Sequence, residues 1–205
     1  MDNHTIYYDT IIKLTSAISR CKDPAKVALI TAESVTNAFA AKGCAVFLVD
    51  RETREMGLVT SHGMSSDFYD KGPIHFMQEI KEAKDAVPIA IHDVNVDPRI
   101  EYPEKIKKEG IASLLGVPII SHDKIIGALR IYTSKPWEFS VTDISMAQAV
   151  ALICGMAMEM CWMHQDHESF KTDIQGKDTF GLGRPQTMSQ LLKCIRGGMK
   201  LPDSK

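Results

Sequence analysis

The sequence predicts an α+β fold in which two helices precede a sheet of five or six strands and one long helix follows it. Residues 110–120 and 125–132 are rich in Ile, Leu and Val and flank a short polar break, a pattern typical of an antiparallel hairpin. Helical periodicity in front of the first strand and an unbroken apolar stretch after the hairpin complete the pattern.

Two helices are expected at the N-terminus. The first covers residues 4–21, where apolar side chains recur at steps of four and three: Tyr7, Ile11, Leu14, Ile18 and Cys21. The second begins at Asp23 and Pro24, because Asp is a good N-cap and Pro suits the first helical position. We expect it to end near Gly43.

Strands are expected at residues 43–50 and 55–62, joined by a polar loop at 51–54. A mixed region follows, and its expected elements are a helical turn at 65–69, a helix at 76–86, a short strand at 88–93 and a short helix at 101–109. The hairpin turn belongs at His122 to Lys124.

The long helix is expected from Val141 to about His164, with Ser140 as N-cap and Asp143 as the acid of a capping box. Residues 144–163 are apolar enough for a membrane span by length, but Gln148 and Glu159 lie within them and no basic flank follows, so we predict no span.

Two apolar stripes run along this helix. They consist of Ile144, Ala147, Ala151, Cys154, Met158 and Cys161, and of Met146, Ala149, Ile153, Met156, Met160 and Met163. A helix with two apolar faces needs two partners. The sheet covers one face, and either the N-terminal helix or a second protomer covers the other. The terminal helices therefore predict a homodimer. Residues 166–205 form an expected polar, flexible tail with a short helix at 187–196.

Composition excludes several classes of function. The chain has 205 residues and a net charge of −2, without the basic excess that nucleic-acid binding requires. Five widely spaced cysteines without a C-x-x-C pair predict reduced thiols rather than disulfides or zinc. The first residues lack the pattern of a secretory signal, so we expect a cytoplasmic protein.

Several motifs occur in a recognisable order. They are Gly-Ile-x-Ser-Leu-Leu-x-Val-Pro at 110–118, Ile-Gly-x-Leu-x-x-Tyr at 126–132 and Phe-Ser-x-x-Asp at 139–143, preceded by the strands at 43–50 and 55–62 and by Asp-x-x-x-Asp-Pro-Arg at 93–99. Their order resembles that of the GAF domain family, over residues 1–165. The resemblance implies a GAF/profilin-like fold, with a central antiparallel sheet and helices on both faces in three layers. It also implies a small-molecule-sensing or dimerising module of a signalling protein.

In GAF domains a small ligand lies between the sheet and the segment that here spans about 63–110. The resemblance therefore implies ligand-binding candidates among polar residues of this region: Asp93, Asp97, Arg99, Tyr102, Arg130 and Tyr132. A structural role is the alternative, because Asp97-Pro98-Arg99 makes a good turn and Arg99 could pair with either acid. Arg130 and Tyr132 share one strand face, directed either at this pocket or at the helices.

No catalytic constellation is visible: the chain has no phosphate-binding Gly-rich loop, no G-x-S-x-G elbow and no His-Glu zinc motif. His164 and His167 are interpreted as a solvated helix end. Some GAF proteins reduce free methionine sulfoxide through clustered cysteines, but Cys44 has no partner between 63 and 115. The cysteine that attaches a bilin in photoreceptor members is missing, and only Phe139 and Asp143 remain of the cyclic-nucleotide pattern.

We therefore expect a non-enzymatic sensory module, with no cofactor identified, that acts through dimerisation or a partner protein. A dimerisation module without a ligand is the first alternative, and a methionine sulfoxide reductase is the second. The sequence contains no kinase, cyclase or DNA-binding segment that would serve as an output.

Overall fold

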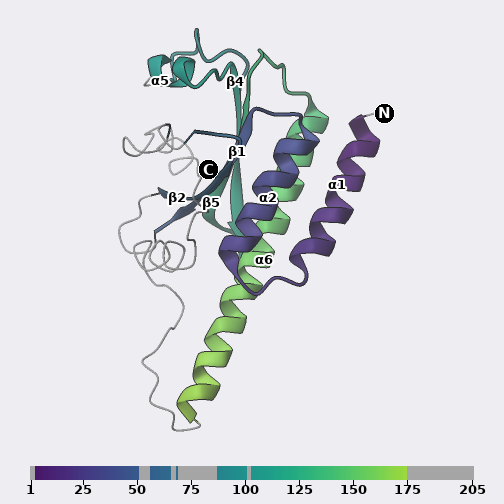
Figure 1. The fold of residues 1–205 in the computed structure, drawn as a ribbon, viewed down its shortest axis with the longest axis vertical. Coiled ribbons are helices and arrows are strands. Elements are labelled where there is room, and N and C mark those ends of the chain that lie inside the picture. Colours follow the sequence, from purple (N-terminus) through teal and green to yellow (C-terminus); the bar gives the residue numbers. More distant parts are fainter. Residues whose placement is uncertain (1–2, 51–55, 66–67, 69–86, 101–102, 175–205) are drawn as a thin grey trace, which may run out of the picture.

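The computed structural model describes residues 3–50, 56–65, 68, 87–100 and 103–174 (Figure 1). One antiparallel sheet has the strand order β2-β1-β5-β4-β3. Its strands are β1 (Gly43–Val49), β2 (Met56–His62), β3 (Ile89–Ile91), β4 (Ser113–Ser121) and β5 (Lys124–Thr133). The predicted α+β class and the antiparallel sheet are confirmed.

Three helices lie on one side of this sheet (Figure 1). They are α1 (Asn3–Ile18), α2 (Pro24–Ala38) and α6 (Val141–Ile174). Helices α2 and α6 pack on the strands, and α1 is outermost, against α2 and α6. The short helix α5 (Pro103–Lys108) lies on the other side, where Ile106 joins a separate apolar cluster. Helices thus occur on both faces, although most of the helical mass covers one.

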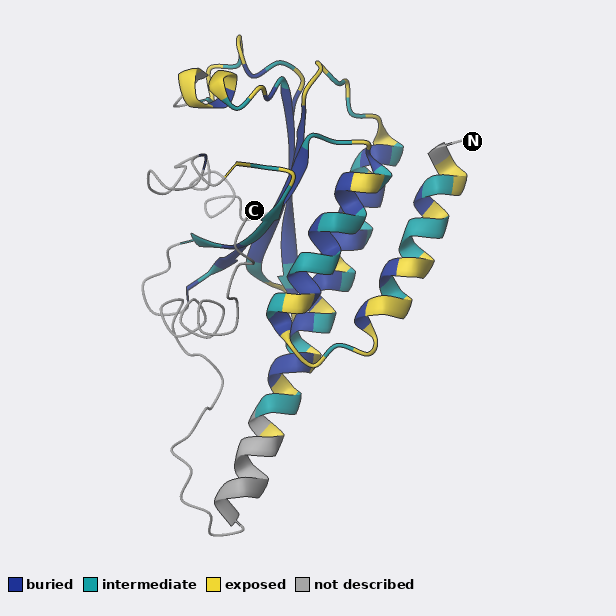
Figure 2. Cartoon of the chain, in the orientation of Figure 1, coloured by how far each residue is buried: buried dark blue, intermediate teal, exposed yellow. Residues whose placement is uncertain are grey.

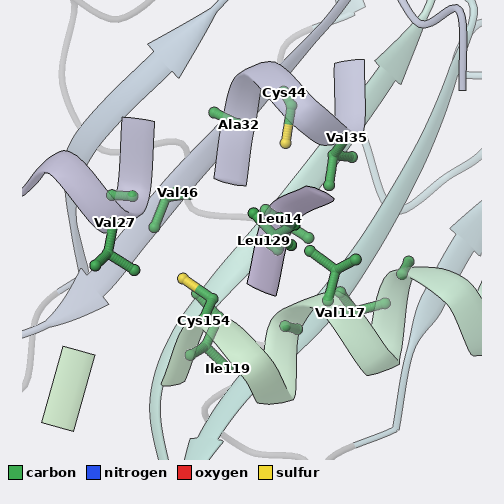
Figure 3. Packing of buried hydrophobic residues seen from close by; sticks show 14 of the residues in the cluster. Leu14, Val27, Ala32, Val35, Cys44, Val46, Val117, Ile119, Leu129 and Cys154 are labelled. Carbon is green, nitrogen blue, oxygen red and sulfur yellow. The ribbon is translucent and has the colours of Figure 1, made fainter. Parts of the chain in front are cut away.

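The core between sheet and helices is buried (Figure 2) and mainly aliphatic, with Cys44 and Cys154 among its members (Figure 3). Leu129 and Ile131 of β5 and Val117 and Ile119 of β4 point into it and are buried. Because side chains alternate along a strand, Ala128 and Tyr132 belong to the opposite face. The two-residue period of β5 therefore separates two different environments within one strand.

Local signals in the sequence place the element ends. Asp23 caps α2 by accepting a hydrogen bond from the Ala25 amide, and Pro24 occupies the first turn, as predicted. The β4–β5 hairpin closes through His122 and Asp123, whose φ angles are 47° and 58°. Positive φ at both central residues is the signature of a type I′ turn, which matches the twist of the strands.

Helix α6 approaches the sheet closely at Gly155. A Cβ atom at this position would lie 2.5 Å from the carbonyl oxygen of Ile120, so no larger residue fits without moving the helix away from β4. This contact fixes the separation between α6 and the sheet.

The predicted end of the long helix near His164 is wrong, because α6 continues to Ile174. Residues 165–174 contain no Pro or Gly, so the change in composition after His164 does not stop the helix. The predicted tail thus begins inside α6. The predicted helix at 76–86, the short helix at 187–196 and most of the turn at 65–69 lie outside the described residues.

Residues Val141–Gln165 of α6 are long and apolar enough to cross a membrane by length and composition. In the structure, α6 packs on β4 and α2, and its buried residues include Val150, Cys154 and Met158. An internal helix of a domain has the same composition.

Candidate functional site

The sheet face opposite α2 and α6 carries the two strand candidates, Arg130 and Tyr132. Tyr132 belongs to the apolar cluster on that face, and the Arg130 guanidinium carbon lies 5.1 Å from the centroid of the Phe47 ring, which belongs to the same cluster. The structure thus decides a choice that the sequence left open: both side chains lie on the sheet face opposite α2 and α6.

Arg130 is 1% exposed, although it carries a full charge. Its neighbours across the ladder are Ala45 on β1 and Gly116 on β4. Because both are small, they leave room for the long side chain over the sheet and the Phe47 ring. A buried guanidinium needs acceptors, anions or aromatic faces around it.

Apolar side chains from two sources enclose this region. Strands β1, β4 and β5 provide one part and the segments around residues 68, 91–94 and 106–111 provide the other: Ala45, Phe47, Phe68, Ile91, Val94, Ile106, Ile111, Leu114, Ala128 and Tyr132. The rings of Phe68 and Tyr132 meet edge to face at 5.8 Å between centroids. A cationic head inside an apolar enclosure is a suitable arrangement for orienting a small polar ligand.

The segment after β3 is held against β4 by its backbone. The Ser113 hydroxyl donates to the carbonyl of His92, and the Val94 amide donates to the carbonyl of Ala112 at 2.9 Å. Asp93 accepts hydrogen bonds from the amide and side chain of Asn95 at 2.9 and 2.8 Å, which closes an Asx turn. The backbone bond lowers the pKa of Asp93 below its ordinary value, with the side-chain bond second.

Asp97 and Arg99 form a second turn at the surface. Arg99 donates from Nε to Oδ1 of Asp97 at 2.9 Å and from Nη2 to Oδ2 at 2.6 Å, and Nη2 also donates to the Ala90 carbonyl at 3.3 Å. These bonds lower the pKa of Asp97 despite partial burial. This geometry matches the structural role that the sequence offered as the alternative to ligand binding, because Arg99 connects its own turn to β3.

The candidate residues therefore fall into two groups. Arg130 and Tyr132 lie together, buried on the sheet, and Asp93, Asp97 and Arg99 make surface turns. Tyr102 lies outside the described residues. Sequence reasoning missed Phe47 and Phe68, which touch the buried pair. Pairing Phe47 with Ala128 across the ladder would have placed Phe47 on this face.

Phe139 and Asp143 make structural contacts on the side of the sheet that carries the three long helices. Asp143 accepts hydrogen bonds from the Tyr7 hydroxyl at 2.6 Å, from the Ser140 amide at 2.9 Å and from Trp137 Nε1 at 3.2 Å. The Ser140 hydroxyl accepts from the Asp143 amide at 3.2 Å, so the predicted capping box is confirmed. Phe139 stacks on Trp137 at 6.0 Å.

The carboxylate of Asp143 joins α1 to the start of α6. Burial alone would raise the pKa of Asp143, but the bonds from Tyr7, Ser140 and Trp137 together lower it. Burial, followed by the bond to this carboxylate, raises the pKa of Tyr7. Because α1 and α6 are far apart in sequence, this contact is a joint between the two terminal helices.

Cys44 and Cys154 are fully buried in the core beneath α2 and α6, and burial raises the pKa of each thiol, that of Cys154 to about 12. Cys44 thus lies on the opposite sheet face from Arg130. Among the residues that the structure describes, no three His, Cys, Asp or Glu side chains gather as metal ligands.

The two predicted stripes of α6 have different surroundings. In the first stripe, Ala147, Ala151, Cys154, Met158 and Cys161 are buried. In the second stripe Met146 is also buried, whereas Met156, Met160 and Met163 are 58%, 68% and 63% exposed. Leu152 adds to the exposed set at 46%. The α1 stripe packs inward, since Tyr7, Leu14 and Ile18 are buried. An exposed apolar surface therefore remains on α6.

Comparisons with known proteins agree with this fold. The model of the GAF domain family matches residues 23–158, and no curated protein sequence matches the chain. The GAF domain of a phosphoenolpyruvate-protein phosphotransferase from Coxiella burnetii is 18% identical with a TM-score of 0.67, covering 80% of this chain and 98% of that one.

Two further solved structures have the same fold. Free methionine-R-sulfoxide reductase from Neisseria meningitidis, in complex with its substrate, is 18% identical with a TM-score of 0.67, covering 80% of this chain and 95% of that one. The GAF domain of cyanobacteriochrome TePixJ is 15% identical with a TM-score of 0.63, covering 71% and 95%. At these identities the likeness shows the fold alone.

Proposed function

The chain belongs to the GAF domain family, and from that premise we propose that it is a sensory or regulatory module that binds a small molecule on the sheet face opposite α2 and α6. The family is commonly sensory, which is the general role of this chain. The proposal adds a site and a ligand chemistry. The ligand carries an anionic or strongly accepting group that meets Arg130, and an apolar part that the surrounding cluster encloses.

One observation carries this proposal: a guanidinium that is 1% exposed lies over the Phe47 ring on the face that carries Tyr132. An Arg presents five N–H donors in a planar fork, which suits a carboxylate or phosphate. The apolar side chains around this fork keep bulk water away from it, which strengthens its attraction for an anion. Asp93, Asp97 and Arg99 belong to the proposal as rim residues that order the covering segment.

Thermal shift with a library of anionic and neutral metabolites tests this site. A ligand at a hundred times its Kd stabilises the native state by about 2.7 kcal/mol, which is easily seen as a rise in Tm. We expect hits to lose their shift in Arg130→Met and to keep it in Lys124→Met, which removes a positive charge from the exposed start of the same strand. Hits that survive Arg130→Met would contradict the site.

The second proposal concerns output, and its surface is the exposed stripe Leu152, Met156, Met160 and Met163 on α6. We propose that two copies pair through this stripe or that a signalling partner covers it. Burying a large aliphatic side chain gives about 1.5–3 kcal/mol, so four such residues are enough to favour association.

Light scattering on the purified chain tests the homodimer. We expect a dimer mass at tens of micromolar, shifted toward the monomer by Met160→Glu and not by Asn37→Glu, which adds the same charge at an exposed position of α2. A monomer mass for the parent chain favours the partner protein instead. Ile11→Glu is unsuitable here, because Ile11 packs against the chain's own core.

A reductase is the third and least supported function. Cys44 is fully buried under the helices, away from the proposed pocket, and its high pKa disfavours a reactive thiolate. We expect no turnover of free methionine sulfoxide by the parent chain. Turnover that Cys44→Ser abolishes would establish an enzyme. We also propose a cytoplasmic location, which the four free cysteines of the described chain support.

A further inference from the structure

The connection between α1 and α2 rests directly on α6. Cys161 Sγ donates to the carbonyl oxygen of Cys21 at 3.4 Å, and Gln165 Nε2 donates to the carbonyl oxygen of Lys22 at 3.4 Å. Cys161 and Gln165 lie one helical turn apart, and they bind consecutive carbonyls. The backbone at 21–22 therefore lies along the surface of α6.

This arrangement places the Cys161 thiol next to the backbone of Cys21. A carbonyl oxygen lies about 2.4 Å from its own Cα, so Cys161 Sγ is within about 5.8 Å of the Cys21 Cα. The Cys21 thiol now faces the Ala17 carbonyl at 3.5 Å, a weak bond that a rotation about χ1 breaks at little cost. This upper bound leaves the Cys161 sulfur within reach of the Cys21 side chain once that side chain rotates toward α6, as a disulfide requires.

The two thiols also differ in reactivity. Cys21 is half-buried and accessible, whereas Cys161 is 3% exposed. Burial, followed by the neighbouring Cys21 and Asp23, raises the pKa of Cys161 to about 11. The outer thiol thus meets an oxidant first, and the inner thiol is in place to resolve the product.

We propose that Cys21 and Cys161 form a reversible disulfide under oxidation by a peroxide. The Cys21 thiolate attacks one oxygen of hydrogen peroxide, the O–O bond breaks, and the products are a sulfenic acid and hydroxide, which takes up a proton to become water. The Cys161 sulfur then attacks the sulfenic sulfur, the S–O bond breaks, and a disulfide and a second water form. Two thiols lose two electrons and two protons, and the peroxide is reduced to two waters.

The cross-link would fix α1 at both ends. Its beginning is already joined to α6 through Tyr7 and Asp143, and the disulfide would join its end to α6 one turn before Gln165. Peroxide would then control whether α1 can leave the domain, independently of any ligand on the opposite sheet face.

The test uses the full chain with Cys194→Ser, because Cys194 lies outside the described residues and could compete. After peroxide treatment, non-reducing peptide mapping by mass spectrometry is expected to show a peptide that joins Cys21 and Cys161. A disulfide closing so long a loop should raise Tm by about 5–15 °C, and dithiothreitol should reverse the rise. The Cys21→Ser variant should show neither effect.

A second test uses the variant Cys161→Ser and detects the sulfenic acid chemically, so that it does not depend on the Tm of this variant. In that variant Cys21 should stop at the sulfenic acid and react with dimedone, whereas the oxidised parent should not. The absence of the joined peptide, a Cys21 link between two chains, or a rise in Tm that persists in Cys21→Ser would each overturn the proposal.

Discussion

The two faces of the sheet differ in what they bury. Beneath α2 and α6 the strands present Leu, Ile and Val, and the packing is close enough that Gly155 is required where α6 meets β4. On the other face the same strands present a charged Arg130, the hydroxyl of Tyr132 and several aromatic rings. One face thus buries mainly aliphatic side chains of the strands, while the other also buries a charged group and a hydroxyl.

The largest expected effect comes from the helical face. Leu129→Ala removes a fully buried side chain between the sheet and the helices, so the free energy of unfolding should fall by about 2–5 kcal/mol. Urea denaturation followed by circular dichroism measures the change. A loss below about 1 kcal/mol would show that this core relaxes around the cavity.

The second largest loss of stability is expected from the hydrogen bond between Tyr7 of α1 and Asp143 of α6. Tyr7→Phe keeps the ring against Phe39, 5.1 Å away, but removes a hydrogen bond to a carboxylate, which costs about 1.5–3 kcal/mol. In the variant, hydrogen exchange should then show that the amides of α1 exchange faster than in the parent, while those of α2 change less. Equal protection of α1 in both proteins would contradict the role of this bond.

Acid should reduce the difference in the free energy of unfolding between the parent and Tyr7→Phe. The folded pKa of Asp143 is lowered, so its stabilisation is complete above the unfolded value of about 3.9 and is lost as the pH falls through the folded value. The stability gap between the parent and Tyr7→Phe should therefore narrow below about pH 4. Urea denaturation at several pH values checks this, and a gap that is constant down to about pH 2 would contradict it.

A substitution on the sheet face opposite α2 and α6 should lower the free energy of unfolding by less. Arg130→Met keeps an unbranched side chain over Phe47 and loses a cation–π contact worth about 0.5–2 kcal/mol, so we expect a cost of about 1–2 kcal/mol, below that of its strand neighbour Leu129→Ala. The same urea measurement compares the two variants. A larger loss from Arg130→Met would reverse the contrast between the faces.

The smallest effect is expected in the surface turn. Asp97→Asn weakens the pair with Arg99, whose side chain is 40% exposed, and such pairs contribute about 0–1 kcal/mol. Raising the salt concentration should reduce the difference from the parent further. A loss above about 2 kcal/mol would mean that this turn, and not only the sheet, stabilises the pocket face.

Local chemistry explains which features were predictable. The caps at Asp23 and Ser140 and the hairpin turn depend on a few neighbouring residues, so the sequence alone identifies them. The direction of Arg130 depends on the register of β5 against β1 and β4, which one strand does not specify. The contacts of Tyr7 with Asp143 and of Cys21 with Cys161 join distant segments, and no local pattern announces them.

Gly155 also has a mechanical consequence. Helix α6 approaches β4 closely there and then extends to Ile174, a length of about 28 Å at 1.5 Å per residue. This part of α6 acts as a lever with its fulcrum at the glycine, so a tilt of about 5° at β4 would move the far end by about 2.5 Å. The exposed methionines begin directly beyond that fulcrum, at Met156, so a displacement too small to alter the core would still move the surface that we propose for association.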